Sequence, residues 1–166
     1  MKQNVINISG FEVSNIHPFF LIAGPCSIES KDHAINHAGI INEICKKLSI
    51  NFVYKSSFDK ANRSSKNSHR GIGIQKGLTI LSDVKKEFNI PILTDVHESY
   101  QCKEIANVVD IIQIPAFLSR QTDLLTAAAE TGKFINIKKG QFLARWDMAV
   151  SYTHLTLPTM SCVCLW

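Results

Sequence analysis

Short apolar runs alternate with segments of helical spacing along most of the chain. The first run, residues 19–24, ends at Gly24-Pro25 and is typical of a strand that is buried on both faces. Beyond it, apolar residues recur at the spacing of one helix face, and Ser30 stands where an N-cap belongs. The apolar positions of this predicted helix are Ala34, Ala38, Ile41, Cys45 and Leu48.

The same alternation continues to residue 139. Later strands are predicted at residues 51–57, 90–95, 108–115 and 134–139. Helical spacing covers Ile74–Phe88 and a short stretch around Gln101–Ala106. A last helix, rich in Ala and Leu, begins at Thr122 or Asp123 and ends at Gly132, a predicted C′ glycine. Strands that alternate with helices through short connections predict parallel βαβ units.

Two architectures are built from such units, the (β/α)8 barrel and the open doubly wound sheet. No G-x-G-x-x-G follows the first strand, so a dinucleotide-binding sheet has little support. Polar residues instead gather directly after the strands, where barrel enzymes place their active sites. A complete barrel needs roughly 250 residues. For a chain of 166 residues we therefore predict an incomplete TIM barrel with about the first five strands, and the open sheet remains the alternative.

Composition and charge narrow the class of protein. With 45% hydrophobic and 19% charged residues, the chain is typical of a soluble globular protein. It has no apolar run long enough to span a bilayer and no signal-peptide pattern at its start. Its five widely spaced cysteines predict a reducing compartment, which we take to be the cytoplasm. The net charge of +4, without an aromatic platform, argues against nucleic-acid binding.

The character of the sequence changes after QFLARWDM. Residues 149–166 follow neither a helical nor a strand period, and SYTHLTLPT is similar to a translated cloning adapter. We expect residues 1–148 to be the first part of a barrel and residues 149–166 to be a non-native tail. A genuine variable C-terminus is the alternative. The C-x-C pair of Cys162 and Cys164 is a weak metal motif, and we do not expect it to bind metal.

The densest group of cations follows the second predicted strand, in KSSFDKANRSSKNSHRG. Lysine supplies point charge, arginine a bidentate fork, and serine or asparagine neutral donors, which together suit a phosphate monoester. A solvated basic loop is the competing interpretation. Lys55 argues against it, because a charge at the end of an apolar strand is costly unless it meets a partner. The cations are Lys55, Lys60, Arg63, Lys66 and Arg70.

Other candidates also lie at predicted strand ends. Side chains alternate along a strand, so one of Lys138 and Lys139 faces the barrel interior, and Lys138 beside Lys55 would suit a small polyanion. Arg120 would add a cation or be a surface charge. Asp95 and His97 are two residues apart. Asp95 would orient a hydroxyl or aldehyde, and His97 would either ligate a metal or move protons. Gln113 stands at the end of its strand, and Asn62 lies in the cationic loop. Cys26 in GPCSIES is either a small core residue or a ligand, whereas Cys45 on the apolar helix face is predicted to be a core residue.

The chain resembles the 3-deoxy-D-manno-octulosonate-8-phosphate synthase family up to about Met148. The matching strings are AGPCSIES, KSSFDKANRSS, TDVHES, DIIQIPAFLSRQTDLL and INIKKGQFLA. KANRSS is more similar to this family than to the heptulosonate-7-phosphate synthases, where the loop resembles KPRTS. The resemblance implies an eightfold, tetrameric barrel that joins phosphoenolpyruvate to arabinose 5-phosphate, with release of phosphate, in lipopolysaccharide biosynthesis.

The resemblance also implies roles for individual residues. The positions that match phosphoenolpyruvate binding are Lys55, Lys60 and Lys138, with the backbone at Ala116 nearby. Gln113 is expected to bind substrate as well. Those that match aldose binding are Asn62, Arg63 and Ser64 for the phosphate and Asp95 for the hydroxyls. Arg120 would reach a phosphate in its own or a neighbouring subunit. Of these, Lys55, Lys138 and Asp95, together with His97, are the residues expected to be catalytic.

Cys26 stands where the metal-dependent branch of the family has cysteine and the other branch has asparagine. The resemblance therefore implies a divalent metal ion with Cys26 as one ligand, and the remaining His, Glu and Asp ligands lie on later strands. Arg145 departs from the proline usual in the family. We expect the 166-residue chain alone to be inactive. The alternatives are a heptulosonate-phosphate or sialic-acid-type synthase, or a non-catalytic fragment.

Overall fold

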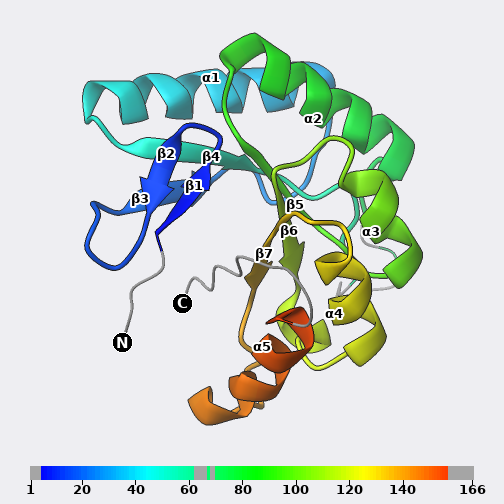
Figure 1. Cartoon of the computed structure of the whole chain (residues 1–166). Coiled ribbons are helices and arrows are strands. Elements are labelled where there is room, and N and C mark those ends of the chain that lie inside the picture. The colour runs from blue at the N-terminus through cyan, green and yellow to red at the C-terminus, as the bar shows by residue number, and fades with distance from the viewer. Residues whose placement is uncertain (1–4, 62–66, 68–69, 157–166) are drawn as a thin grey trace. The chain divides into compact units, whose positions relative to one another are not determined.

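The structure is a computed structural model that describes residues 5–61, 67 and 70–156. Its described residues divide into two compact units, with the boundary between Leu93 and Thr94. The parallel sheet has the strand order β3-β4-β5-β6-β7, and the division falls inside β5 (Ile92–Asp95) (Figure 1). A sheet whose strands follow the chain order confirms the predicted α/β class with parallel βαβ units.

The first unit contains the two strands that position the first candidate residues. β3 (Phe20–Ala23) pairs in parallel with β4 (Asn51–Lys55), and Ile22 lies opposite Val53. β4 pairs in turn with the first half of β5. Both strands are shorter than predicted. The residues after them form isolated bridges and loop hydrogen bonds instead of a continuous ladder, because polar side chains there bond to nearby backbone.

Helices α1 (Lys31–Lys47) and α2 (Ile74–Phe88) pack side by side in the same unit, and α1 also contacts β4 (Figure 1). Ser30 is the N-cap of α1 as predicted, because its hydroxyl accepts a hydrogen bond from the His33 amide at 3.1 Å. One expected core position is wrong. Leu48 is 63% exposed, because the helix ends before it. The buried residues of α1 are Ala34, Ala38, Asn42 and Cys45.

A short antiparallel hairpin precedes the parallel sheet. β1 (Ile6–Ile8) pairs with β2 (Phe11–Val13), and Ser9 and Gly10 form the turn with positive φ angles of 46° and 106°. Two-residue hairpin turns of this hand require positive φ at both positions. The sequence interpretation did not include this hairpin.

The second unit contains β6 (Ile111–Ile114) and β7 (Phe134–Ile137), which pair in parallel. Helix α4 (Thr122–Ala129) packs between α3 (Ser99–Ile105) and α5 (Met148–Thr156) (Figure 1). All four residues of β6 are buried, which fits a strand covered on both faces. Two 3₁₀ turns complete the unit, at Ala116–Leu118 and Arg145–Asp147.

Two details of this unit differ from or extend the expectation. Gly132 is not the C′ residue, because α4 ends at Ala129 and Glu130 is its C-cap; Gly132 follows in a left-handed conformation at φ 72°. Helix α5 covers part of the predicted tail, and the buried Ser151 donates a hydrogen bond to the Ser119 carbonyl at 2.5 Å. The non-native tail stays a prediction, and residues 157–166 lie outside the described range. Among the described helices, none has the length and apolarity to cross a membrane.

Candidate active site

Two lysine side chains converge on one buried hydroxyl at the end of β4. The Lys55 ammonium donates to Ser57 Oγ at 2.9 Å, and the Lys60 ammonium donates to the same oxygen at 2.7 Å. Ser57 is fully buried, whereas both lysines are half-buried. We call these three residues the cation cluster. The structure therefore brings together Lys55 and Lys60 as predicted, and it adds Ser57 as the group that joins them.

The cation cluster is arranged to bind an anion. Two ammonium groups bonded to one oxygen lie no more than about 6 Å apart, and at that distance they repel each other by roughly 3 kcal/mol at an effective dielectric constant of about 20. The oxygens of a phosphate or carboxylate would accept hydrogen bonds from both ammonium groups and reduce this repulsion.

Cys26 lies beside the cation cluster through contacts of the main chain. Ser27 forms a parallel bridge with Ser57, and the Ile28 amide donates to the Ser57 carbonyl at 2.9 Å. Gly24 makes this approach possible. At its φ of 154°, a Cβ would lie 2.1 Å from the carbonyl oxygen of Lys55, which no side chain tolerates. Cys26 itself is exposed.

The cysteines of the described chain differ in their environment. Burial raises the pKa of the Cys45 thiol above its usual value. The same effect raises the pKa of Cys102 to about 11. Both are buried core residues, as expected for Cys45, and both stay protonated near neutral pH. Cys26 is the one cysteine of the described ranges that is exposed to a ligand.

The cationic loop after the cation cluster is only partly described. Arg70 forms an ion pair with Asp59 at 2.6 Å and is 60% exposed in its side chain, so it serves the loop and not the cluster. Asp59 also raises the pKa of the Arg70 guanidinium, through a hydrogen bond and its charge. The candidates Asn62, Arg63, Ser64 and Lys66 lie outside the described residues.

Polar side chains form a row across three strands of the second unit. Gln113 on β6 is in register with Asn136 on β7. The Val96 amide donates to the Gln113 carbonyl at 3.0 Å, which sets Asp95 beside Gln113. Adjacent residues in register project to the same face of a sheet. Asp95, Gln113 and Asn136, here called the polar row, are all at most 6% exposed.

Hydrogen bonds and an ion pair organise the polar row. The Asn136 amide nitrogen donates to Gln113 Oε1 at 3.0 Å. His97 Nε2 lies 3.3 Å from Asp95 Oδ2, and the two side chains are only 11% and 7% exposed. A carboxylate beside an imidazole orients the ring and fixes which ring nitrogen carries the proton. Asp95 and His97 therefore face each other, as their spacing predicted.

The two adjacent lysines after β7 have different surroundings. The Lys139 ammonium donates to the carbonyls of Gly140 and Leu143 at 3.0 and 2.9 Å, so it stabilises the following turn. Lys138 continues the ladder, because its amide donates to the Ile114 carbonyl. Two residues after Asn136, it projects from the face that carries the polar row. This favours Lys138 over Lys139 as the candidate cation.

The remaining candidates of the second unit lie on the connection after β6. Ala116 begins a 3₁₀ turn, and its carbonyl accepts a hydrogen bond from the Ser119 hydroxyl at 2.9 Å. Arg120 is exposed beyond this turn, which leaves both of its predicted roles open. Over the described ranges, no three His, Cys, Asp or Glu side chains are gathered in a way that would hold a metal ion.

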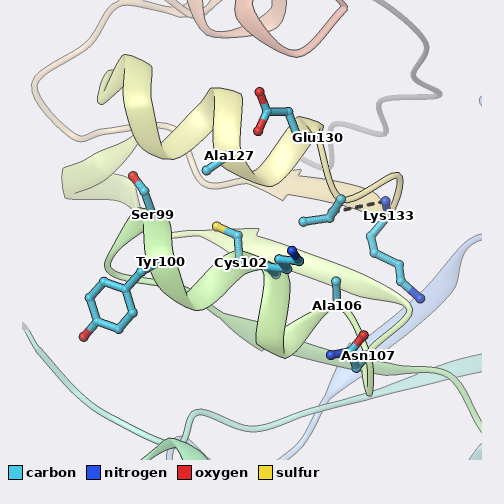
Figure 2. A pocket seen from close by; sticks show the side chains of 10 residues that line it. Ser99, Tyr100, Cys102, Ala106, Asn107, Ala127, Glu130 and Lys133 are labelled. Carbon is cyan, nitrogen blue, oxygen red and sulfur yellow. Dashed lines mark hydrogen bonds between the residues drawn. The ribbon is translucent and has the colours of Figure 1, made fainter.

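A pocket of about 820 Å³ lies between α3 and α4, on the helical side of the second unit (Figure 2). Its lining includes Tyr100 and Cys102 from α3, and Glu130 and Lys133 from the segment that follows α4. No member of the polar row lines it. Because barrel-type enzymes react at the carboxyl ends of the strands, this pocket is not the candidate active site.

Sequence reasoning missed two residues of the site. Ser57 was one serine among several in KSSFDKANRSS, and only its side-chain contacts distinguish it. Asn136 had a readable signal. It precedes Lys138 by two residues in an otherwise apolar strand, and a buried polar residue at that spacing indicates the same face.

Curated proteins from Rickettsia match this chain closely, and all three described here are named 2-dehydro-3-deoxyphosphooctonate aldolase. The Rickettsia felis protein is 59% identical over 153 residues, which cover 92% of this chain and 56% of the relative. The Rickettsia prowazekii protein is 61% identical over 146 residues, or 88% and 53%. The Rickettsia bellii protein is 58% identical over 146 residues with the same coverage. The chain thus spans about half the length of these relatives.

A family model also matches the chain. The model described as the DAHP synthetase I family matches residues 8–161. That range includes the cation cluster, Cys26 and the polar row. The match extends over nearly the whole chain, and so the chain belongs to the DAHP synthetase I family.

Proposed function

We propose that the chain is the N-terminal part of a 3-deoxy-D-manno-octulosonate-8-phosphate synthase. The enzyme would join phosphoenolpyruvate, D-arabinose 5-phosphate and water, and release 3-deoxy-D-manno-octulosonate 8-phosphate and phosphate. The observation that carries this proposal is the cation cluster, in which Lys55 and Lys60 share the Ser57 hydroxyl. The name of the Rickettsia relatives, 2-dehydro-3-deoxyphosphooctonate aldolase, supports the octulosonate product.

The charge of the substrates explains why several cations are needed. Phosphoenolpyruvate carries about three negative charges and must approach a second phosphate, so uncompensated repulsion would prevent the encounter. In the proposal, Lys55, Lys60 and Lys138 bind phosphoenolpyruvate, with the Gln113 amide and the Ala116 backbone. The aldose phosphate is assigned to Asn62, Arg63 and Ser64, and Arg120 reaches a phosphate in its own or a neighbouring subunit.

The reaction forms one carbon–carbon bond and replaces one phosphate ester. C3 of phosphoenolpyruvate attacks the aldehyde carbon of the pentose phosphate, and water adds at C2. The added water loses a proton, and the former aldehyde oxygen takes one. The bond between C2 and the ester oxygen then breaks, phosphate leaves with that oxygen, and the C2 hydroxyl loses its proton to become the keto group. Asp95 orients the hydroxyls of the aldose in this scheme, and His97 moves the proton; the 3.3 Å distance between His97 Nε2 and Asp95 Oδ2 supports this pairing.

The proposal includes the architecture and setting of the longer protein. We assign β3–β7 to the first five strands of a (β/α)8 barrel, because the strands are parallel, follow the chain order and carry their polar residues at their carboxyl ends. The longer protein would be a cytoplasmic homotetramer. The 166-residue chain alone would lack turnover, because Arg63 and Lys138 serve a site that also uses later strands. Those strands belong to the part of the longer relatives that this chain does not cover.

Cys26 fits a metal ligand in one respect, because it is an exposed thiol in a turn after a strand. The described residues do not complete a metal site around it. We therefore propose that the His, Glu and Asp ligands come from the part of the longer protein beyond this chain. A divalent ion held there would supply Lewis-acid activation of water or a carbonyl group.

The test is a comparison of aldoses in the complete gene product. Phosphate release with phosphoenolpyruvate is measured against arabinose 5-phosphate, erythrose 4-phosphate and N-acetylmannosamine, with product masses as a second readout. We expect kcat/KM for arabinose 5-phosphate to exceed the others by about 100-fold or more. A preference for erythrose 4-phosphate would establish the second candidate, a heptulosonate-phosphate synthase, which the family description favours. The 166-residue chain is assayed alongside.

A further inference from the structure

Gln113 and Asn136 are two carboxamides buried side by side on neighbouring strands. They are 5% and 6% exposed, and they occupy paired positions on β6 and β7. One hydrogen bond joins them, from Asn136 Nδ2 to Gln113 Oε1 at 3.0 Å. A buried amide pair of this kind has a direction, because one residue gives its donor and the other gives its acceptor.

The direction decides what Gln113 offers to a ligand. With its oxygen engaged by Asn136, the group that remains is its NH2. Phosphate and carboxylate oxygens accept hydrogen bonds and repel a carbonyl oxygen. If the pair were reversed, Gln113 would donate to Asn136 and turn its own oxygen toward the ligand. The observed direction is therefore the one that suits an anionic substrate.

The Asn136 side chain is oriented by its surroundings as well. Its Oδ1 atom is buried and has no hydrogen-bond partner among the described residues. Lys138 follows two residues later, and alternation along the chain directs it to the same face, where it is exposed. A buried acceptor left without a donor is costly, and such atoms in native proteins commonly serve a site.

We propose that Asn136 is a positioning residue, which holds the Gln113 carboxamide with its NH2 toward the anionic substrate and so contributes to selective binding of phosphoenolpyruvate. This inference rests on the proposed function and deepens it. Asn136 acts through Gln113 and need not touch the substrate. Loss of the Asn136 donor would free Gln113 to rotate, and a rotating amide presents its repulsive oxygen part of the time.

The test uses the complete gene product with Asn136→Leu, which keeps the side-chain size and removes both polar atoms. Binding of phosphoenolpyruvate and of arabinose 5-phosphate is measured separately by calorimetry, together with the melting temperature. We expect Kd for phosphoenolpyruvate to rise about tenfold, since one neutral hydrogen bond is involved. Kd for arabinose 5-phosphate should change less than about twofold, and the melting temperature should not fall, because the buried acceptor is removed too.

Asn42→Leu is the matched control. Asn42 is also a buried asparagine, 6% exposed, but it lies on α1 in the first unit. It should leave both Kd values unchanged. Should Asn136→Leu fail to fold, Asn136→Ala is measured in its place with the same expected difference between the two ligands.

The outcomes separate this inference from the proposed function. Wild-type protein that does not bind phosphoenolpyruvate saturably would overturn the proposed function itself. Wild-type binding with an unchanged Kd in Asn136→Leu would overturn only the positioning role. Equal weakening of both ligands, with a lower melting temperature, would show that Asn136 is structural and would also overturn it.

Discussion

The cation cluster and the polar row both place polar groups at the ends of buried strands, and they stabilise them differently. In the cation cluster, two charged side chains stay half-buried and share one hydroxyl. In the polar row, the side chains are almost completely buried, and two of the three are neutral amides joined by a hydrogen bond. The cation cluster supplies positive charge, and the polar row fixes the orientation of its side chains.

This difference matches two separate demands on a site for anionic substrates. Charge acts over distance and tolerates small displacements, so flexible lysines near water can supply it. Orientation requires that a side chain have only one low-energy position, which burial and defined partners provide. The following experiments test whether the two regions divide the work in this way, and all use the complete gene product.

The largest expected effect concerns Cys26, which is joined to the cation cluster through the main chain. If its thiolate is a metal ligand, exhaustive chelation should abolish activity and a divalent ion should restore it. Cys26→Ser should lower the metal content found by elemental analysis, because a hydroxyl is a poor substitute for thiolate. Cys26→Asn should keep some chelator-resistant turnover. Full wild-type activity in metal-free protein would exclude a metal role.

A loss of about 10³-fold in kcat/KM is expected for Lys138→Ala, because a charge facing the most anionic substrate is removed. Lys139→Ala is the matched control. Its ammonium bonds only carbonyls in the structure described, so its loss should lower stability by about 1–3 kcal/mol and leave kcat/KM within a few fold. Steady-state kinetics and urea denaturation measure both effects. If Lys139→Ala lost activity while Lys138→Ala lost only stability, the roles assigned to the two lysines would be wrong.

Ser57→Ala tests the shared hydroxyl of the cation cluster. Each of its two hydrogen bonds involves a charged donor, so KM for phosphoenolpyruvate should rise by about 10- to 100-fold. The adjacent Ser56 is equally buried, and its hydroxyl donates to the Pro25 carbonyl at 3.0 Å. Ser56→Ala should therefore reduce stability with little effect on that KM. A similar KM in both variants would mean that Ser57 does not organise the lysines.

The smallest expected effect concerns Tyr54, which lies inside β4 next to the lysine at the end of that strand. Burial raises the pKa of Tyr54 to about 12, and the neighbouring Ser56 side chain opposes this only in part. A raised pKa means that the folded state favours the neutral phenol. Its contribution is fully present below pH 10 and is lost as the pH rises toward 12, by about 2 kcal/mol. Alkaline denaturation of Tyr54→Phe should lack this loss, whereas Tyr100→Phe, on a 77% exposed residue, should retain it.

The sequence predicted the parts of this molecule that depend on periodic burial. The parallel strands, the Ser30 cap and the clustering of cations after strands all follow from local spacing. Leu48 and Asn42 show the limit. Helical spacing alone places Leu48 in the core, but the helix ends before it, and Asn42 occupies a buried position despite its polarity. Helix ends and buried amides depend on tertiary neighbours, which local spacing does not contain.

The candidate site shows the same limit at the level of single atoms. Its residue types were predicted from strand ends and from the family resemblance, including Lys55, Lys60 and Asp95. The sharing of one hydroxyl by two ammonium groups was not, because it depends on rotamers that sequence does not specify. The choice between Lys138 and Lys139 likewise required the carbonyl contacts of Lys139.

The close approach at Gly24 has a consequence for how the protein can diverge. The spacing between the segment of Cys26 and the end of β4 is determined by backbone against backbone, not by the sizes of surrounding side chains. Nearby core residues can therefore be substituted during evolution without changing the spacing between the Cys26 and Lys55 segments. Gly24 itself cannot be substituted in this way, because any other amino acid would force the two strand ends apart.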